Sequence, residues 1–178
     1  RSPFFYGFYT FQEEYHLVSS LVRTVSGCRE QEKNLLNSLA IVTTFSQNIV
    51  VNVQEMLLIL EKEYEEKETS IYLVQEMLPS ALSKLTVIRD GGFRLCHKVI
   101  AERILTVLHA PDNPEATLAD VTFKAAENYI QTMSCLYGSE DKYVNDILKE
   151  LIIDRSYIDS EERKTKFSVL VETMPRWS

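Results

Sequence analysis

The chain has 178 residues, of which 45% are apolar and 25% are charged. This composition fits a compact folded domain of a size that needs neither a disulfide nor a metal to fold, and it excludes a disordered chain. Asp and Glu outnumber Lys and Arg by 26 to 19, a net charge of −7, which disfavours nucleic acid as a partner because phosphate binding depends on positive charge.

Apolar residues recur at helical spacing along most of the chain, and the period-two alternation of half-buried strands is missing. An all-α fold is therefore predicted. After an aromatic segment at residues 1–10, Thr10 can cap a first helix that ends at Gly27. A second helix is expected from Glu30 to about Ser46.

A third helix is expected to begin near Val53 and to continue into the charged stretch 61–68, which we interpret as a solvated helix face. Ser70 can cap a fourth helix, and Pro79 predicts a kink or a split in it because proline lacks the backbone N–H. We expect Gly91-Gly92 to end this helix. Its inward residues are predicted to be Ile71, Val74, Met77, Leu78, Leu82, Leu85 and Ile88.

A fifth helix is predicted over residues 93–108, and Asn113-Pro114 supplies a cap and a first helical residue for a sixth helix that stops at Gly138. Ser139 and Ser160 can cap a seventh and an eighth helix. We treat residues 1–178 as a single all-helical domain, with an aromatic strap at 1–10 and a short tail at 175–178.

Eight consecutive helices pair into four antiparallel hairpins that start near residues 10, 49, 93 and 139. This spacing resembles that of HEAT and armadillo repeats, which implies a right-handed stack of helix pairs. The four units share no residue-level similarity, so the resemblance is one of architecture only. A globular helical bundle is the alternative, because it would produce the same series of helices.

Reactive side chains are few and scattered. The histidines His16, His97 and His109 match no metal-binding or catalytic spacing, and no glycine-rich phosphate loop is present. We expect no enzyme activity, no cofactor and no metal. The odd number of widely spaced cysteines predicts an intracellular, cytoplasmic or nuclear protein, and no apolar run is long enough for a membrane span.

Basic residues gather between residues 84 and 103, against the acidic balance of the whole chain. Arg94 and Lys98 are four residues apart, so on the predicted fifth helix they would share one face, with Arg89 and Arg103 nearby. We expect these four residues to bind an acidic or amphipathic helical segment of a partner protein. Alternatively, Lys98 pairs with Glu102 and the others are solvated.

Aromatic residues are concentrated at the start of the chain, where six of the eight residues from 4 to 11 are Phe or Tyr. Such rings bury large apolar areas. We expect Phe4, Phe5 and Tyr6 either to cap the first hairpin or to anchor another chain, and Trp177 near the other end to do the same.

Since no catalytic motif is visible, the sequence predicts a non-catalytic interaction module that presents a groove between helices to a partner segment. The alternative is a homo-oligomerisation domain of a larger structural protein, held together by the aromatic residues. An enzyme whose site is built from dispersed residues is the least favoured hypothesis.

Overall fold

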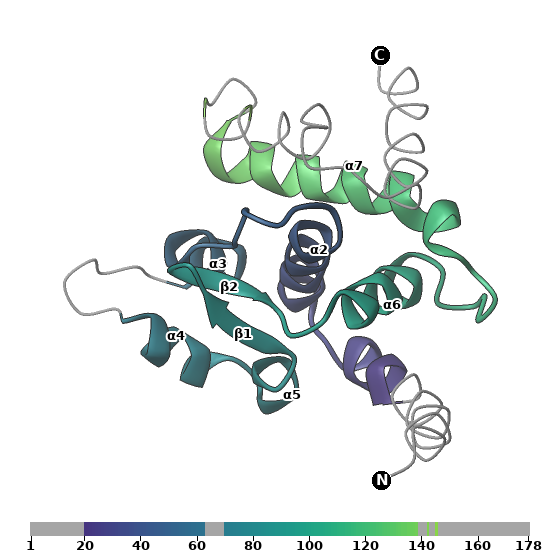
Figure 1. Ribbon diagram of the computed structural model, residues 1–178, viewed down its shortest axis with the longest axis horizontal. Helices are drawn as coiled ribbons and strands as arrows, with labels where there is room; N and C mark the ends of the chain where they lie inside the picture. Colours follow the sequence, from purple (N-terminus) through teal and green to yellow (C-terminus); the bar gives the residue numbers. More distant parts are fainter. Residues whose placement is uncertain (1–19, 63–69, 139–141, 143–144, 146–178) are drawn as a thin grey trace, which may run out of the picture.

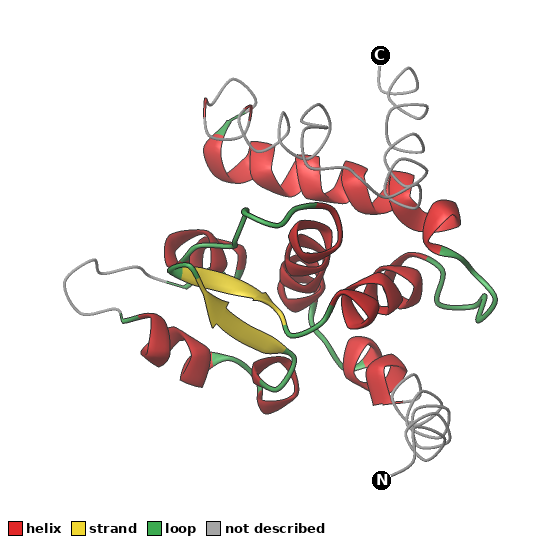
Figure 2. Ribbon diagram, viewed as in Figure 1, coloured by secondary structure: helices red, strands yellow, loops and turns green. Residues whose placement is uncertain are grey.

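The computed structural model describes residues 20–62, 70–138, 142 and 145 of the chain. Within them the protein is mostly helical, as predicted, and it also contains one small antiparallel sheet, which was not predicted (Figures 1 and 2). A helical segment at residues 20–26 precedes the other elements. These are α2 (Glu30–Phe45), α3 (Val53–Ile59), α4 (Ile71–Met77), α5 (Ser80–Ser83), β1 (Thr86–Arg89), β2 (Gly92–Leu95), α6 (Lys98–His109) and α7 (Leu118–Tyr137).

The central element is α2, which covers the range predicted for the second helix. Its first turn is fixed by Glu32, whose carboxylate accepts hydrogen bonds from the Arg29 backbone N–H at 2.9 Å and from the Arg29 guanidinium at 2.8 Å. Every residue from Leu35 to Thr44 is buried, on all sides of the helix. A helix that is covered all round belongs to the interior of a fold.

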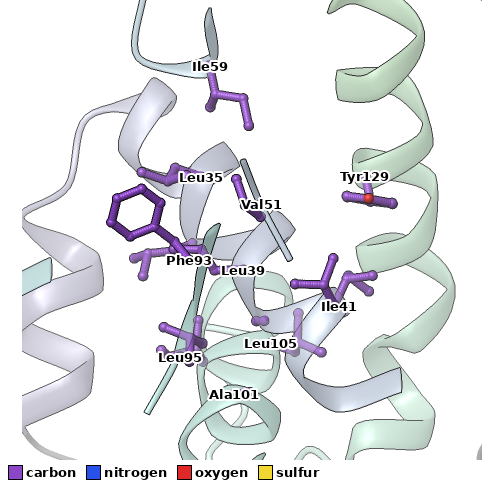
Figure 3. Packing of buried hydrophobic residues seen from close by; sticks show 14 of the residues in the cluster. Leu35, Leu39, Ile41, Val51, Ile59, Phe93, Leu95, Ala101, Leu105 and Tyr129 are labelled. Carbon is purple, nitrogen blue, oxygen red and sulfur yellow. The ribbon is translucent and has the colours of Figure 1, made fainter. Parts of the chain in front are cut away.

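Helices α6 and α7 both pack against α2 and against each other. The inward residues of α7 are four apart and include Ala125, Tyr129 and Met133. Figure 3 shows Tyr129 of α7 and Leu105 of α6 in the same cluster of buried side chains as the α2 residue Ile41. Thr117, rather than Asn113, caps α7, because the Asp120 carboxylate accepts from both its backbone N–H and its hydroxyl. The predicted stop at Gly138 is confirmed.

A β-hairpin occupies the region where the end of the fourth helix and the start of the fifth were predicted. Its strands pair with Thr86 opposite Leu95 and Arg89 opposite Gly92. The turn between them places Asp90 at φ 50° and Gly91 at φ 77°, the two positive angles that a tight type I′ hairpin turn requires. The all-α prediction is wrong here, because this local turn preference outweighs the helical spacing of the apolar residues.

Strand β2 is the buried strand of the sheet. On its second edge it forms a one-residue bridge to Val51, with Phe93 and Val51 exchanging backbone hydrogen bonds of 2.8 and 3.0 Å. The approach is close, since a Cβ on Gly92 would lie 2.4 Å from the Val50 Cγ2 atom. Phe93 points toward Leu35 and Leu39 of α2 (Figure 3), so the sheet is part of the same core.

Pro79 splits the predicted fourth helix, as expected. Helix α4 ends at Met77, and the short helix α5 begins directly after the proline. The predicted cap at the start of α4 is also confirmed, because the Ser70 hydroxyl accepts from the Leu73 backbone N–H at 3.2 Å.

The described residues give no support for a HEAT- or armadillo-like stack. In such a stack each helix pair contacts only its sequence neighbours. Here α2, from the predicted first pair, packs mainly against α6 and α7, which lie beyond the predicted second pair. The third predicted pair begins with a strand rather than a helix. The described elements form a mostly helical fold with one small sheet.

Candidate functional site

Arg94 is part of the core and not of a basic surface. It lies on β2 with 6% of its surface exposed, and its guanidinium reaches the end of α2. There it donates to the carbonyl of Gln47 at 2.6 Å, to that of Val42 at 3.0 Å, and to that of Ser46. A helix end leaves carbonyls unpaired and carries partial negative charge, and α2 has no basic residue of its own in its last turn. Arg94 supplies this missing cap.

The prediction that Arg94 and Lys98 share one helix face is therefore wrong, since Arg94 lies on a strand and Lys98 is the first residue of α6. Lys98 is 3.9 Å from the Glu102 carboxylate, the pairing expected under the alternative interpretation. Arg103 donates to the Pro114 carbonyl at 3.4 Å, and Arg89 pairs with Asp90 at 3.2 Å at the hairpin turn. The four basic residues thus contact four different parts of the chain.

The aromatic candidates Phe4, Phe5, Tyr6 and Trp177 lie outside the described residues. Their predicted role as caps or anchors stays a prediction.

No group of three or more His, Cys, Asp or Glu side chains with metal-site geometry occurs in the part of the chain that the structure describes. His97 and His109 each form a hydrogen bond within the protein. The His97 imidazole accepts from the Val99 backbone N–H at 3.1 Å and caps α6. His109, near the end of α6, lies 2.7 Å from the side-chain oxygen of Asn37.

The contact of His109 belongs to a polar junction between three helices. Asn37 of α2 uses its amide N–H to donate to the Ala125 carbonyl of α7 at 2.9 Å, which leaves its oxygen as the acceptor for the His109 Nε2–H. Burial, together with the smaller effect of the positive charge of Lys124, lowers the pKa of His109 to about 4. At neutral pH the imidazole is uncharged, and the junction connects α2, α6 and α7 without a buried charge.

The clearest surface feature is on α4. Seven large apolar side chains are exposed among the described residues, and three of them belong to this one helix of seven residues: Tyr72 at 69%, Leu73 at 46% and Met77 at 42%. The opposite side of α4 is anchored by Val74 and Leu78, which are buried. We call the exposed residues Tyr72, Leu73, Glu76 and Met77 the outer α4 face.

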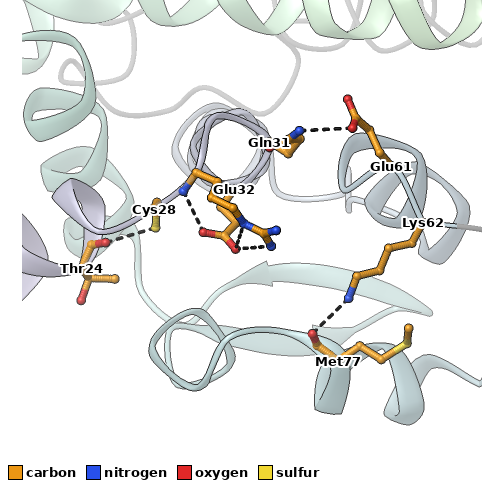
Figure 4. A network of polar contacts seen from close by, with 8 residues as sticks. Thr24, Cys28, Gln31, Glu32, Glu61, Lys62 and Met77 are labelled. Carbon is orange, nitrogen blue, oxygen red and sulfur yellow. Dashed lines mark hydrogen bonds and ion pairs between the residues drawn. The ribbon is translucent and has the colours of Figure 1, made fainter.

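This face is connected to the rest of the fold through the residues that follow α3. The chain leaves α3 through Glu61, at φ 54°, and the Lys62 N–H bonds back to the Leu57 carbonyl at 2.8 Å, which turns the Lys62 side chain toward α4. Its ammonium group donates to the Met77 carbonyl at 3.2 Å (Figure 4). Glu61 in turn accepts from Gln31 of α2 at 3.2 Å. The α4 helix is thus connected to the core helix through two polar contacts.

The prediction that Met77 faces inward is wrong, because the structure leaves it 42% exposed while Val74 and Leu78 are buried. The signal for a two-sided helix was present in the sequence. Residues 71–78 contain six apolar side chains out of eight, distributed around the whole circumference, and one such helix covers the core with only part of them.

No family model, no curated protein and no solved structure matches the chain. No described helix is long and apolar enough to pass through a bilayer.

Proposed function

We propose that the protein is a non-catalytic interaction module and that the outer α4 face is the surface on which it binds a partner protein. The observation that carries this proposal is the concentration of Tyr72, Leu73 and Met77, all substantially exposed, on one short anchored helix. Tyrosine and methionine are favoured in the cores of protein interfaces, and tyrosine in particular is enriched among the residues that dominate binding energy.

The surface proposed here replaces the basic stripe predicted from the sequence. Arg94 is committed to the carbonyls at the end of α2, and Lys98 to Glu102, so neither offers an unpartnered charge to an acidic segment. A repeat stack with a concave binding surface is not part of the proposal, because α2 packs against α6 and α7 rather than against its sequence neighbours alone.

An intracellular location fits this proposal. Cys28, Cys96 and Cys135 all lie among the described residues, and none of them forms a disulfide. Free thiols, two of them exposed, are typical of a reducing compartment.

The proposal is tested by affinity capture from an extract of the cells that make the protein. The bait carries Leu73→Ser and Met77→Ser together, and a control bait carries Val22→Ser and Val99→Ser, which also remove two exposed apolar side chains. Partners that the unchanged protein retains are expected to be lost from the first bait and kept by the second. Equal retention by both baits would remove the outer α4 face from consideration.

A further inference from the structure

The outer α4 face has an ordered chemical pattern. Helical spacing places Leu73 and Met77 in one row along the helix and Tyr72 and Glu76 in a second row beside it. One row is therefore apolar, and the other has an aromatic ring followed by a carboxylate. Glu76 is exposed and forms no salt bridge with any residue in the described part of the chain.

The charge around this face is negative. Among the described residues, Glu61 at the end of α3 and Glu76 on the face itself are exposed carboxylates, and the Lys62 ammonium group donates to the Met77 carbonyl. The sequence that joins residue 62 to residue 70 adds four Glu and one Lys, tethered directly to the start of α4. The whole chain carries −7, so the field at this face favours a positively charged partner.

The same charge argues against a second copy of the chain as the occupant. A two-fold symmetric contact through α4 would bring Glu76 of one copy and Glu76 of the other into the same interface. Like charges facing each other across an interface are unfavourable. A partner with basic residues beside an apolar stripe satisfies both parts of the pattern.

We infer that the outer α4 face binds a basic amphipathic helix of a partner protein. This inference rests on the proposed function and adds the chemical class of the partner. The apolar stripe of the partner helix packs on Leu73 and Met77 and against the Tyr72 ring, and its Lys or Arg side chains pair with the Glu76 carboxylate. Helix-on-helix contact of this kind uses anchor residues one turn apart, the spacing of Leu73 and Met77.

The probes are three synthetic helical peptides of equal length with the same Leu and Ala stripe, whose polar positions are all Lys, all Gln or all Glu. Binding to the full chain is measured by fluorescence anisotropy at low and at high salt. The Lys peptide is expected to bind about tenfold or more tightly than the Glu peptide, with the Gln peptide between them and the difference reduced by salt.

Variants locate the binding on α4. Replacing Leu73 and Met77 by Ser is expected to weaken the Lys peptide by about tenfold or more, while the control pair Val22→Ser and Val99→Ser leaves it unchanged. Glu76→Lys is expected to weaken the Lys peptide and to strengthen the Glu peptide.

Several results overturn the inference. If the Glu peptide binds as tightly as the Lys peptide or more tightly, the inferred class of partner is wrong. If that binding is nevertheless lost in the variant with Leu73→Ser and Met77→Ser, the outer α4 face is still the docking face. If sedimentation shows a dimer that this variant dissociates, the occupant is a second copy. If no peptide binds in an α4-dependent way, the inference fails, and the affinity capture decides separately whether the proposed function survives.

Discussion

Helices α2 and α4 have similar apolar patterns and opposite surroundings. Both carry apolar side chains around most of their circumference. For α2 the same chain supplies cover on every side, through α3, β2, α6 and α7. For α4 the described part of the chain buries the side of Val74 and Leu78 and leaves Tyr72, Leu73 and Met77 exposed, and in Figure 1 the helix lies at the edge, on the opposite side from α7. The apolar pattern of a helix thus identifies the residues that favour burial. The packing of the other elements determines how many of these residues are buried.

The most direct way to break this comparison is to make the same substitution in both helices. Leu39→Ala in α2 removes a fully buried side chain and is expected to lower the free energy of unfolding by about 3–4 kcal/mol. Leu73→Ala in α4 removes a side chain that is 46% exposed and is expected to lower it by less than about 1 kcal/mol. Urea denaturation measures both. Equal losses would show that the outer α4 face is buried within the chain itself.

The end of α2 depends on a residue far away in the sequence. Arg94→Ala removes the guanidinium that donates to the Ser46 and Gln47 carbonyls and leaves the Val42 carbonyl with the Ser46 N–H alone, so we expect a loss of about 3 kcal/mol. The matched control is Arg89→Ala on the neighbouring strand, whose side chain is 62% exposed and pairs with Asp90. It is expected to change stability by less than about 0.5 kcal/mol. A similar small effect for Arg94 would contradict its capping role.

The hairpin offers a comparison between two adjacent glycines. Gly92→Ala places a Cβ 2.4 Å from Val50 Cγ2 and 2.8 Å from the Val51 carbonyl oxygen, and is expected to cost about 2–3 kcal/mol. Gly91→Ala meets no atom within 4 Å but must adopt φ +77°, at an expected cost of about 1 kcal/mol. Thermal unfolding of the two variants distinguishes steric overlap from backbone strain. The reverse order would show that β2 does not approach residue 50 so closely.

The elements that the sequence predicts well are those with local signals. The range of α2 follows from its periodicity, the start of α4 from the Ser70 hydroxyl, the split from Pro79, and the end of α7 from Gly138. The hairpin also had a local signal, because Asp-Gly between short apolar runs is typical of a type I′ turn. The helical spacing of the apolar residues on both sides favours the other interpretation, in which Gly91-Gly92 ends a helix.

The candidate site was harder to predict, for a different physical reason. The destination of Arg94 is set by a contact more than forty residues away along the chain, to the carbonyls that end α2, and no pattern around Arg94 indicates it. The exposure of Met77 depends on how many sides of α4 the core can cover. Tertiary packing decides both, and the local spacing of residues leaves them open.

The smallest expected effect concerns pH and the cover that α7 provides to α2. The pKa of His109 is lowered to about 4 in the folded protein, against about 6.5 in the unfolded chain, so the unfolded chain binds the proton more readily between these values. The stability that the uncharged His109 side chain contributes is fully present above about pH 6.5 and is lost as the pH falls toward 4. We expect the unchanged protein to lose about 1–2 kcal/mol more than His109→Gln between pH 7 and pH 5. Parallel stability profiles of the two proteins in urea would show that protonation of His109 does not weaken the junction with Asn37.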